Sequence, residues 1–206
     1  MSSARARILG TAREITEKQG AAPTMAALAR AVGISRQALY LHFPDRGQLL
    51  LALVAHIDEQ EQLAAGIAAV TQAGDAAAAI RAWAQVQTWH NPKIAAAARA
   101  LNDTRHADPA AAAAWADRTG NRMRGATSIV ERLRAEGRLD PTWPTTEAAA
   151  LLWELTSFRV WDDLVNDARI APDRYVEIIT AAALGTLGAA VTPPPGPGLD
   201  GSPDSR

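Results

Sequence analysis

The sequence predicts an all-α protein, and three observations lead to this fold class. Alanine runs at 76–79, 95–98 and 110–114 favour helix, because alanine has the highest intrinsic helix propensity. No segment of strand length alternates β-branched with polar residues, as a half-buried strand would. Residues 24–49 have the spacing of two short helices joined by a glycine turn, with a third helix directly after them. The 206 residues suffice for one large domain or two small ones.

Composition and charge narrow the class of protein further. The chain has no cysteine, which excludes disulfide scaffolds and thiolate metal sites. The formal net charge is only −1, but residues 1–47 hold seven basic and three acidic side chains, so the remainder of the chain is acidic. Such an asymmetry indicates a small phosphate-binding head on an acidic body.

We expect a cytoplasmic protein that does not enter a membrane. The longest uncharged apolar stretch, residues 178–191, is too short to span a bilayer. The N-terminus has arginines but lacks the apolar core of a signal peptide.

The first predicted helix ends at Gly20, because glycine commonly terminates a helix. Its apolar stripe comprises Ile8, Leu9, Ala12 and Ile15. Before this stripe, Arg5 and Arg7 form either a solvated arm or a contact with a DNA phosphate or the minor groove.

A helix-turn-helix pattern follows, centred on a glycine. Thr24 can cap the first of the two helices, and Gly33 supplies the left-handed residue that ends it. Ser35 can cap the second helix, which we place at about residues 35–42. The inner face of this second helix carries Leu39 and Phe43. The second helix of such a pair can enter the DNA major groove, where it acts as the recognition helix.

The next helix begins at Asp45, which together with Gln48 can form a capping box. Residues 58–74 could extend this helix into the body, with possible breaks at Gly66 and Gly74.

Five further helices are predicted from their start signals, which gives about nine in all. They are expected from Asp75 to about His90, from Asn91–Pro92 onward, from Asp108–Pro109 past a weak point at Gly120 to about Glu136, from 142–146 to about Asp167, and from Ala171–Pro172 to about Ala190. The Pro/Gly-rich residues 192–206 cannot bury a core and should be disordered.

The segment GISRQALYLHFPDRGQLL, residues 33–50, resembles the signature of TetR-family transcriptional regulators. The matching residues are Gly33, Ser35, Leu39, Tyr40, His42, Phe43, Pro44, Arg46 and Leu49. The resemblance implies an N-terminal three-helix DNA-binding domain, placed at residues 1–47, and a helical-bundle domain for ligand binding and dimerisation at residues 48–191. Gly47 departs from the family, which typically has glutamate there, and so leaves open how firmly the first turn of the next helix is held.

Three side chains of the recognition helix are candidates for reading bases. Arg36 can donate two parallel hydrogen bonds to guanine, and Gln37 can bond to adenine in the same two-point manner. Ala38 could offer its methyl group to thymine. Ser35, which caps this helix, completes the set at its N-terminal end.

Four further residues are candidates for contacts with the DNA backbone. The resemblance implies that Tyr40 and His42 contact phosphate, a positioning role without base information. Thr24 can donate its hydroxyl to phosphate, and Arg46 replaces the lysine that is usual in the family. The alternative for Tyr40 and His42 is that they are surface side chains that complete a helix.

The body carries aromatic and polar side chains that could line a small-molecule pocket. They are Trp83, Gln87, His90, Trp115, Thr119, Arg122, Met123 and Trp153. Such a lining would suit a small apolar or aromatic effector, and the resemblance also implies an effector pocket in this domain. The alternative is that the tryptophans belong to the core and that His90 is a buried histidine with its hydrogen bonds satisfied.

Residues 138–188 resemble the C-terminal region of some TetR regulators, whose last two helices pair with their symmetry mates as a four-helix dimer bundle. The residues expected on this surface are Leu151, Leu155, Phe158, Val165, Tyr175, Ile178, Ile179, Ala182 and Leu187. A two-fold homodimer also fits duplex DNA, because two recognition helices must meet successive major-groove faces of a near-palindromic site.

These observations lead to the hypothesis of a repressor that leaves its operator when a small effector binds. An enzyme is the first alternative, but the sequence has no glycine-rich phosphate loop, no HExxH motif and no nucleophile elbow. We therefore predict no catalytic residue, metal or cofactor. The second alternative is a helical DNA-binding regulator that responds to a protein partner and has no effector pocket.

Overall fold

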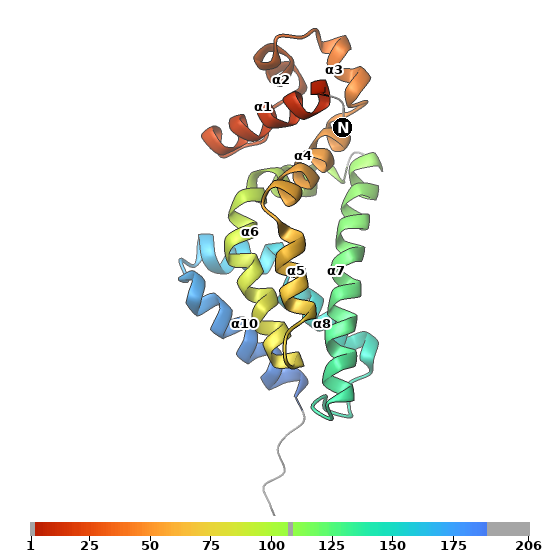
Figure 1. Ribbon diagram of the computed structural model, residues 1–206, viewed down its shortest axis with the longest axis vertical. Coiled ribbons are helices and arrows are strands. Elements are labelled where there is room, and N and C mark those ends of the chain that lie inside the picture. The colour runs from red at the N-terminus through yellow and green to blue at the C-terminus, as the bar shows by residue number, and fades with distance from the viewer. Residues whose placement is uncertain (1–2, 107–108, 189–206) are drawn as a thin grey trace, which may run out of the picture.

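A computed structural model of the protein describes residues 3–106 and 109–188, and these residues confirm the all-α class. The helices are α1 (Ser3–Gln19), α2 (Met25–Val32), α3 (Arg36–His42), α4 (Arg46–Gln60), α5 (Leu63–Thr71), α6 (Ala76–Thr104), α7 (Pro109–Ala135), α8 (Thr145–Leu155), α9 (Phe158–Trp161), the π-helical segment η1 (Asp162–Asp167) and α10 (Pro172–Leu187). Helices α1 to α3 form a head at one end of an elongated body, and α4 leads from the head into the body (Figure 1). No described helix is both long and apolar enough to cross a membrane. Asp108 and the predicted tail at 192–206 lie outside the described residues.

The ends of the head helices are fixed by the predicted caps. The hydroxyl of Thr24 accepts a hydrogen bond from the Ala27 amide at 3.2 Å, and that of Ser35 accepts one from Ala38 at 3.0 Å. Gly33 ends α2 with a φ of 75°, a left-handed conformation that glycine adopts without strain. Local chemistry therefore determines the helix-turn-helix.

The core of the head continues into the body. Leu39 and Phe43 of α3 pack in one buried cluster with Leu53 and Ile57 of α4, and this cluster also includes Ile94 of α6. The predicted domain boundary between residues 47 and 48 falls inside α4, which is continuous there. The two-domain division stays a prediction, but the helix at its boundary belongs to both parts.

Arg5 has a structural role that neither sequence-based alternative included. Its guanidinium donates to the carbonyl oxygen of His42 at 2.8 Å and lies 4.4 Å from the centre of the Phe43 ring. A cation at the C-terminus of α3 bonds to a carbonyl that the helix leaves free. Arg5 therefore joins α1 to the recognition helix, and only Arg7 extends into solvent as expected for an arm.

Two helix boundaries in the body differ from prediction. Residues 58–74 do not extend α4, because the helix ends at Gln60 and Gln62 takes a left-handed φ of 55° before α5 begins. Gly66 lies inside α5 and is not a break. Asn91–Pro92 does not start a helix either, since α6 continues through it. Pro92 is exposed, so the carbonyl oxygen that loses its helical partner there can bond to water.

The predicted helix from 142–146 to Asp167 is interrupted, whereas α7 is continuous through Gly120. Helix α8 ends at Leu155, and Ser157 caps α9 by accepting from the Val160 amide at 3.1 Å. Helix α9 then continues as the π-helical segment. Because α8 ends there, the last carbonyl groups of α8 and the turn are free to accept side-chain hydrogen bonds.

Asp58, in the last turn of α4, attaches this helix to the centre of the body. Its carboxylate lies 2.7 Å from the Arg118 guanidinium of α7 and 2.9 Å from Nε2 of His90 on α6. Burial alone would raise the pKa of Asp58, but the hydrogen bond with His90 and the ion pair with Arg118 outweigh it and lower the pKa. The charged carboxylate therefore stabilises the junction between α4, α6 and α7.

Two glycines of α7 allow a matched test of packing. A Cβ atom at Gly125 would lie 2.5 Å from the Trp83 ring, whereas one at Gly120 would have its nearest neighbour, Arg124 Nη1, at 3.9 Å. We expect Gly125→Ala to lower the free energy of unfolding by about 1–3 kcal/mol through overpacking. Gly120→Ala should raise it by about 0.5–1 kcal/mol, since alanine favours helix. Urea unfolding of both variants checks the opposite signs; two changes of the same sign would contradict this packing.

The depressed pKa of Asp58 predicts a specific pH dependence. A carboxyl group whose pKa is lowered by folding adds stability above its unfolded pKa and loses it as pH falls through the folded value. We expect Asp58→Asn to lower the free energy of unfolding at neutral pH by about 1–3 kcal/mol. The difference from the wild type should shrink between about pH 5 and pH 3. Urea titrations across this range measure it, and a difference independent of pH would contradict the assignment.

Candidate functional site

The predicted DNA-contacting residues lie on the head, at the end of the molecule away from the body (Figure 1). Arg36, Gln37 and Tyr40 of α3 are exposed, and Ala38 and His42 are half-buried. All the long polar side chains near the N-terminus of α3 are thus available to a partner in solution. This geometry allows a helix to present base-reading groups in a groove.

Thr24 and Ser35 cap α2 and α3, but capping uses each hydroxyl oxygen as an acceptor. The hydroxyl hydrogen of each stays available as a donor to phosphate. Arg46 begins α4 and is half-buried; its Nε is buried and has no hydrogen-bond partner in the described part of the chain.

Leu41 is a surface residue of the recognition helix that the sequence analysis did not include. It is 83 % exposed, the highest value among the large hydrophobic side chains exposed on the described residues. A leucine in this position adds an apolar group to the polar face of α3. The signal was present in the sequence, because Leu41 falls between Tyr40 and His42, both assigned to the outer face.

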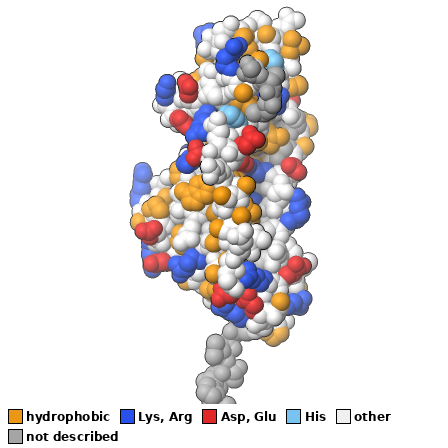
Figure 2. Space-filling model, in the orientation of Figure 1, with side chains coloured by type: hydrophobic (Ala, Val, Ile, Leu, Met, Phe, Trp, Pro, Cys, Tyr) orange, Lys and Arg blue, Asp and Glu red, His pale blue; other side chains and the backbone are white. Residues whose placement is uncertain are grey.

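Charged side chains of both signs are interspersed over the body in the view of Figure 2, and the head also presents Lys and Arg side chains there. The difference between the two regions therefore lies in their net charge, which is positive for the head and negative for the remainder of the chain. A net positive head favours approach to phosphate through long-range attraction.

A cavity of about 430 Å³ lies inside the body, between α4, α5, α6 and α7 and the turn at 156–158. Four predicted ligand-binding residues line it, namely Trp83, Gln87, His90 and Arg122. Three others, Trp115, Thr119 and Trp153, line an adjoining cavity of about 430 Å³ that shares Arg118 and Arg122 with the first. Met123 lines neither of the two and borders a separate hollow on the outer side of α7 and α8.

The cavity wall is held by hydrogen bonds to the end of α8. Gln87 donates to the Thr156 carbonyl at 2.5 Å and accepts from the Tyr175 hydroxyl. Arg122 donates from Nη2 to the carbonyls of Trp153 at 3.0 Å and Thr156 at 2.5 Å. These carbonyls are free because α8 stops at Leu155.

The positive charge of Arg122 is destabilised by its surroundings. Burial, and to a lesser extent the like charge of Arg118, lower the pKa of its guanidinium to about 10. The described residues give Arg118 a carboxylate partner, Asp58, whereas Arg122 bonds to carbonyl groups alone.

Asp58, Asn91, Arg118 and Phe158 are among the residues of the inner cavity that sequence reasoning missed. The sequence suggests that residues 58–74 could extend a helix and that Asn91 begins one, and neither pattern predicts a cavity wall. Phe158 is predicted on the dimer surface. The i, i+4 spacing of Arg118 and Arg122 on α7 was the one available signal, since it places both on the same face.

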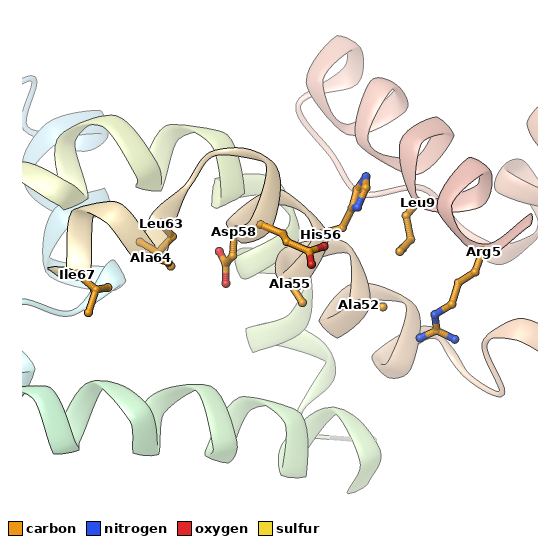
Figure 3. Close-up of a pocket in the computed structure, with 10 residues that line it drawn as sticks. Arg5, Leu9, Ala52, Ala55, His56, Asp58, Leu63, Ala64 and Ile67 are labelled. Carbon is orange, nitrogen blue, oxygen red and sulfur yellow. The ribbon is translucent and has the colours of Figure 1, made fainter. Parts of the chain in front are cut away.

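A second, more open hollow of about 750 Å³ separates the head from the body (Figure 3). Arg5 and Leu9 reach it from α1, while α4 contributes Ala52, Ala55, His56 and Asp58 and α5 contributes Leu63, Ala64 and Ile67. It shares Asp58, Leu63 and Ile67 with the inner cavity. The end of α4 is therefore the wall between the two spaces. No group of three potential metal ligands occurs among the described residues.

Part of the predicted dimer surface is buried within a single chain. Tyr175, Ile179 and Leu187 are at most 1 % exposed within a single chain, because this side of α10 packs against the body. The other predicted residues keep partial exposure and remain candidates: Leu151, Leu155, Phe158, Val165, Ile178 and Ala182. An apolar stripe shows that a helix face is covered, but not whether its own chain or a second copy covers it.

Comparison with known structures shows the same architecture elsewhere. A transcriptional regulator from Saccharomonospora viridis, crystallised with choline, superposes with a TM-score of 0.71 at 15 % identity, covering 91 % of this chain and 99 % of that one. One from Rhodococcus sp. Rha1 gives 0.67 at 18 % identity, covering 91 % and 96 %. RolR in complex with resorcinol gives 0.57 at 20 % identity, covering 90 % and 88 %. At these identities the likeness is one of fold.

The match to a known family is confined to the head and the start of α4. No curated protein matches the sequence. Residues 8–53 match the family described as "Bacterial regulatory proteins, tetR family", a segment that extends from the first turns of α1 into α4 and includes the whole helix-turn-helix. The head of this chain therefore matches the helix-turn-helix domain of TetR-family regulators, and the chain as a whole shares the fold of the regulators compared above.

Proposed function

We propose that the protein is a homodimeric repressor that binds a near-palindromic operator and leaves it when a small molecule occupies the inner cavity. The observation that carries this proposal is the position of α4. Its Leu53 and Ile57 pack in the core of the head, and its Asp58 lines the cavity one residue later. A change at the cavity wall therefore acts on the helix that supports the recognition helix.

The division of labour on α3 supports specific DNA binding. Arg36 and Gln37 are exposed at its N-terminal end, where they can read base edges. Tyr40 and His42, one turn further, are placed to fix the register on the phosphates, with Thr24, Ser35 and Arg46 as further donors. Ala38 and Leu41 offer apolar contact to thymine methyl groups.

Small-molecule control is supported by the cavity and by related folds. A volume of about 430 Å³ with a mostly apolar lining and a few polar groups is typical of a small-molecule site. Two regulators of the same fold were crystallised with choline and with resorcinol. The effector can cause release only if it binds the DNA-free arrangement of the heads more tightly than the DNA-bound one.

A regulator controlled by a protein partner is the alternative, and the hollow between head and body is the observation that favours it. That hollow is larger and more open, and Ile67 on its rim is 40 % exposed. Control from this side would need no occupant in the inner cavity. Release of operator DNA by a small molecule in a purified system distinguishes the two.

The base-reading and phosphate-contacting roles can be separated by selecting bound sequences from random duplex DNA. The wild type should return a near-palindrome. Arg36→Ala should lose preference at one position per half-site, a change of about 1–3 kcal/mol. Tyr40→Phe should weaken all sequences about equally, by about 0.5–1.5 kcal/mol. The control Arg81→Ala removes an exposed cation from α6 in the body and should change neither. The reverse pattern for Arg36 and Tyr40 would contradict the assignment.

The release mechanism is tested with the selected operator. A screen of metabolites by intrinsic tryptophan fluorescence should find a compound with a saturable signal, since Trp83 lines the cavity. The same compound should lower operator affinity, and operator DNA should lower affinity for the compound by the same factor. A compound that binds without any reciprocal effect would contradict ligand-induced release.

A further inference from the structure

We propose that the inner cavity takes a small organic monoanion, a carboxylate on a flat apolar body, with the carboxylate bound by Arg122. The inference rests on the proposed function, since it names the chemical class of the effector for the same cavity. It starts from the balance of charge on the cavity wall.

The wall carries two cations and one anion. Arg118 and Arg122 project from successive turns of α7, and Asp58 is the carboxylate that faces them from α4. Asp58 accepts hydrogen bonds from both terminal nitrogens of Arg118, at 2.7 and 3.4 Å. The negative charge of Asp58 is therefore balanced by the positive charge of Arg118. Of the two arginines on the described wall, Arg122 is the one whose positive charge has no carboxylate partner.

Arg122 also has hydrogen-bond donors to spare. Its hydrogen bonds within the described residues all come from Nη2, which donates to two carbonyl groups. Nε and Nη1 remain for a ligand. Nε and Nη1 point to different sides of the guanidinium, so a carboxylate accepts from one of them, in a charge-assisted hydrogen bond that is short and strong.

Two buried polar groups on α6 point to the same conclusion. Asn91 and His90 are 6 % and 4 % exposed, and both line the cavity. Asn91 Nδ2 and His90 Nδ1 have no partner in the described part of the chain. Buried polar groups normally have a hydrogen-bond partner, because a buried donor or acceptor without one destabilises the folded protein. An anionic ligand supplies acceptors for Asn91, and a hydroxyl on it could donate to His90 Nδ1.

The remaining wall determines the body of the ligand. Trp83, Ile94 and Phe158 are large apolar side chains, and the Trp83 ring packs closely against α7 at Gly125. A compact inorganic anion would leave these walls unfilled. A cation such as choline would meet a net positive wall. A flat apolar monocarboxylate meets both requirements.

Such a ligand would also affect α4 through electrostatic repulsion. Its carboxylate would lie beside Asp58, which is bonded to Arg118, and two carboxylates that share neighbouring guanidiniums repel each other. The ligand would weaken the attachment of α4 to α7. This is the contact on which the position of the head depends.

The test uses matched pairs of carboxylate and amide in isothermal titration calorimetry: benzoate and benzamide, phenylacetate and phenylacetamide, 2-naphthoate and 2-naphthamide. In at least one pair the carboxylate should bind about tenfold or more tightly than its amide, because charge-assisted hydrogen bonds are about twice as strong as neutral ones. Choline should not bind.

Variants assign the preference to a residue. Arg122→Gln should reduce the carboxylate-to-amide ratio to within about threefold, whereas Arg122→Lys should keep a preference for the carboxylate. Arg124→Gln removes an exposed cation two residues away on the same helix and should change nothing. The ratio does not depend on the folded fraction, so partial loss of folding in one variant leaves the comparison valid.

The possible failures are distinguishable. Amides that bind as tightly as their carboxylates in every pair that binds, binding by no pair at all, or a carboxylate preference that survives Arg122→Gln would overturn the anion inference. A carboxylate that binds through Arg122 without changing operator affinity would support the ligand class but contradict the proposed release mechanism.

Discussion

The attachment of α4 by the Asp58 carboxylate is the constraint on which the arrangement of this protein depends. Asp58 lies in the last turn of the helix that supports the recognition helix, and its carboxylate contacts both His90 of α6 and Arg118 of α7. The lowered pKa shows that these bonds outweigh the cost of burial. One side chain thus joins the head, the centre of the body and the cavity wall. Within the head, Arg5 bonds α1 to the last turn of α3.

The interruption between α8 and α9 provides hydrogen-bond acceptors for side chains of the cavity wall. Ending α8 at Leu155 frees the carbonyls of Trp153 and Thr156, and these hold Arg122 and Gln87 in place. Arg122 is thereby kept at the cavity without a carboxylate partner among the described residues. A continuous helix would have used those carbonyls internally. The proposed anion site is therefore a consequence of where a helix stops, and the proposed coupling follows from how near that site lies to Asp58.

The parts of the fold that follow from local chemistry could be predicted, and those that follow from packing could not. Thr24, Gly33 and Ser35 act within one turn of themselves, so the helix-turn-helix and its exposed face were predictable. Pro92 does not break α6, because the packing of that helix against its neighbours outweighs a local cost of about 3 kcal/mol. Gln62 takes a left-handed conformation, although the sequence has no glycine there that would predict it.

Contacts between distant parts of the chain could not be predicted. The periodicity of α10 showed an apolar face, yet only the structure showed that Tyr175 and Ile179 face their own chain. Asp58 and Arg118 are sixty residues apart, and no local pattern could pair them.

The central claim is that the Asp58 attachment sets the position of the heads. The chain has no cysteine, so Ala31→Cys introduces a single label site on the exposed side of α2. Pulsed electron paramagnetic resonance then gives the distance between spin labels on the two heads of the proposed homodimer, measured without DNA. We predict a narrow distance distribution with Asp58 present and a displaced or clearly broader one after Asp58→Asn. Identical distributions for the two proteins would contradict the account.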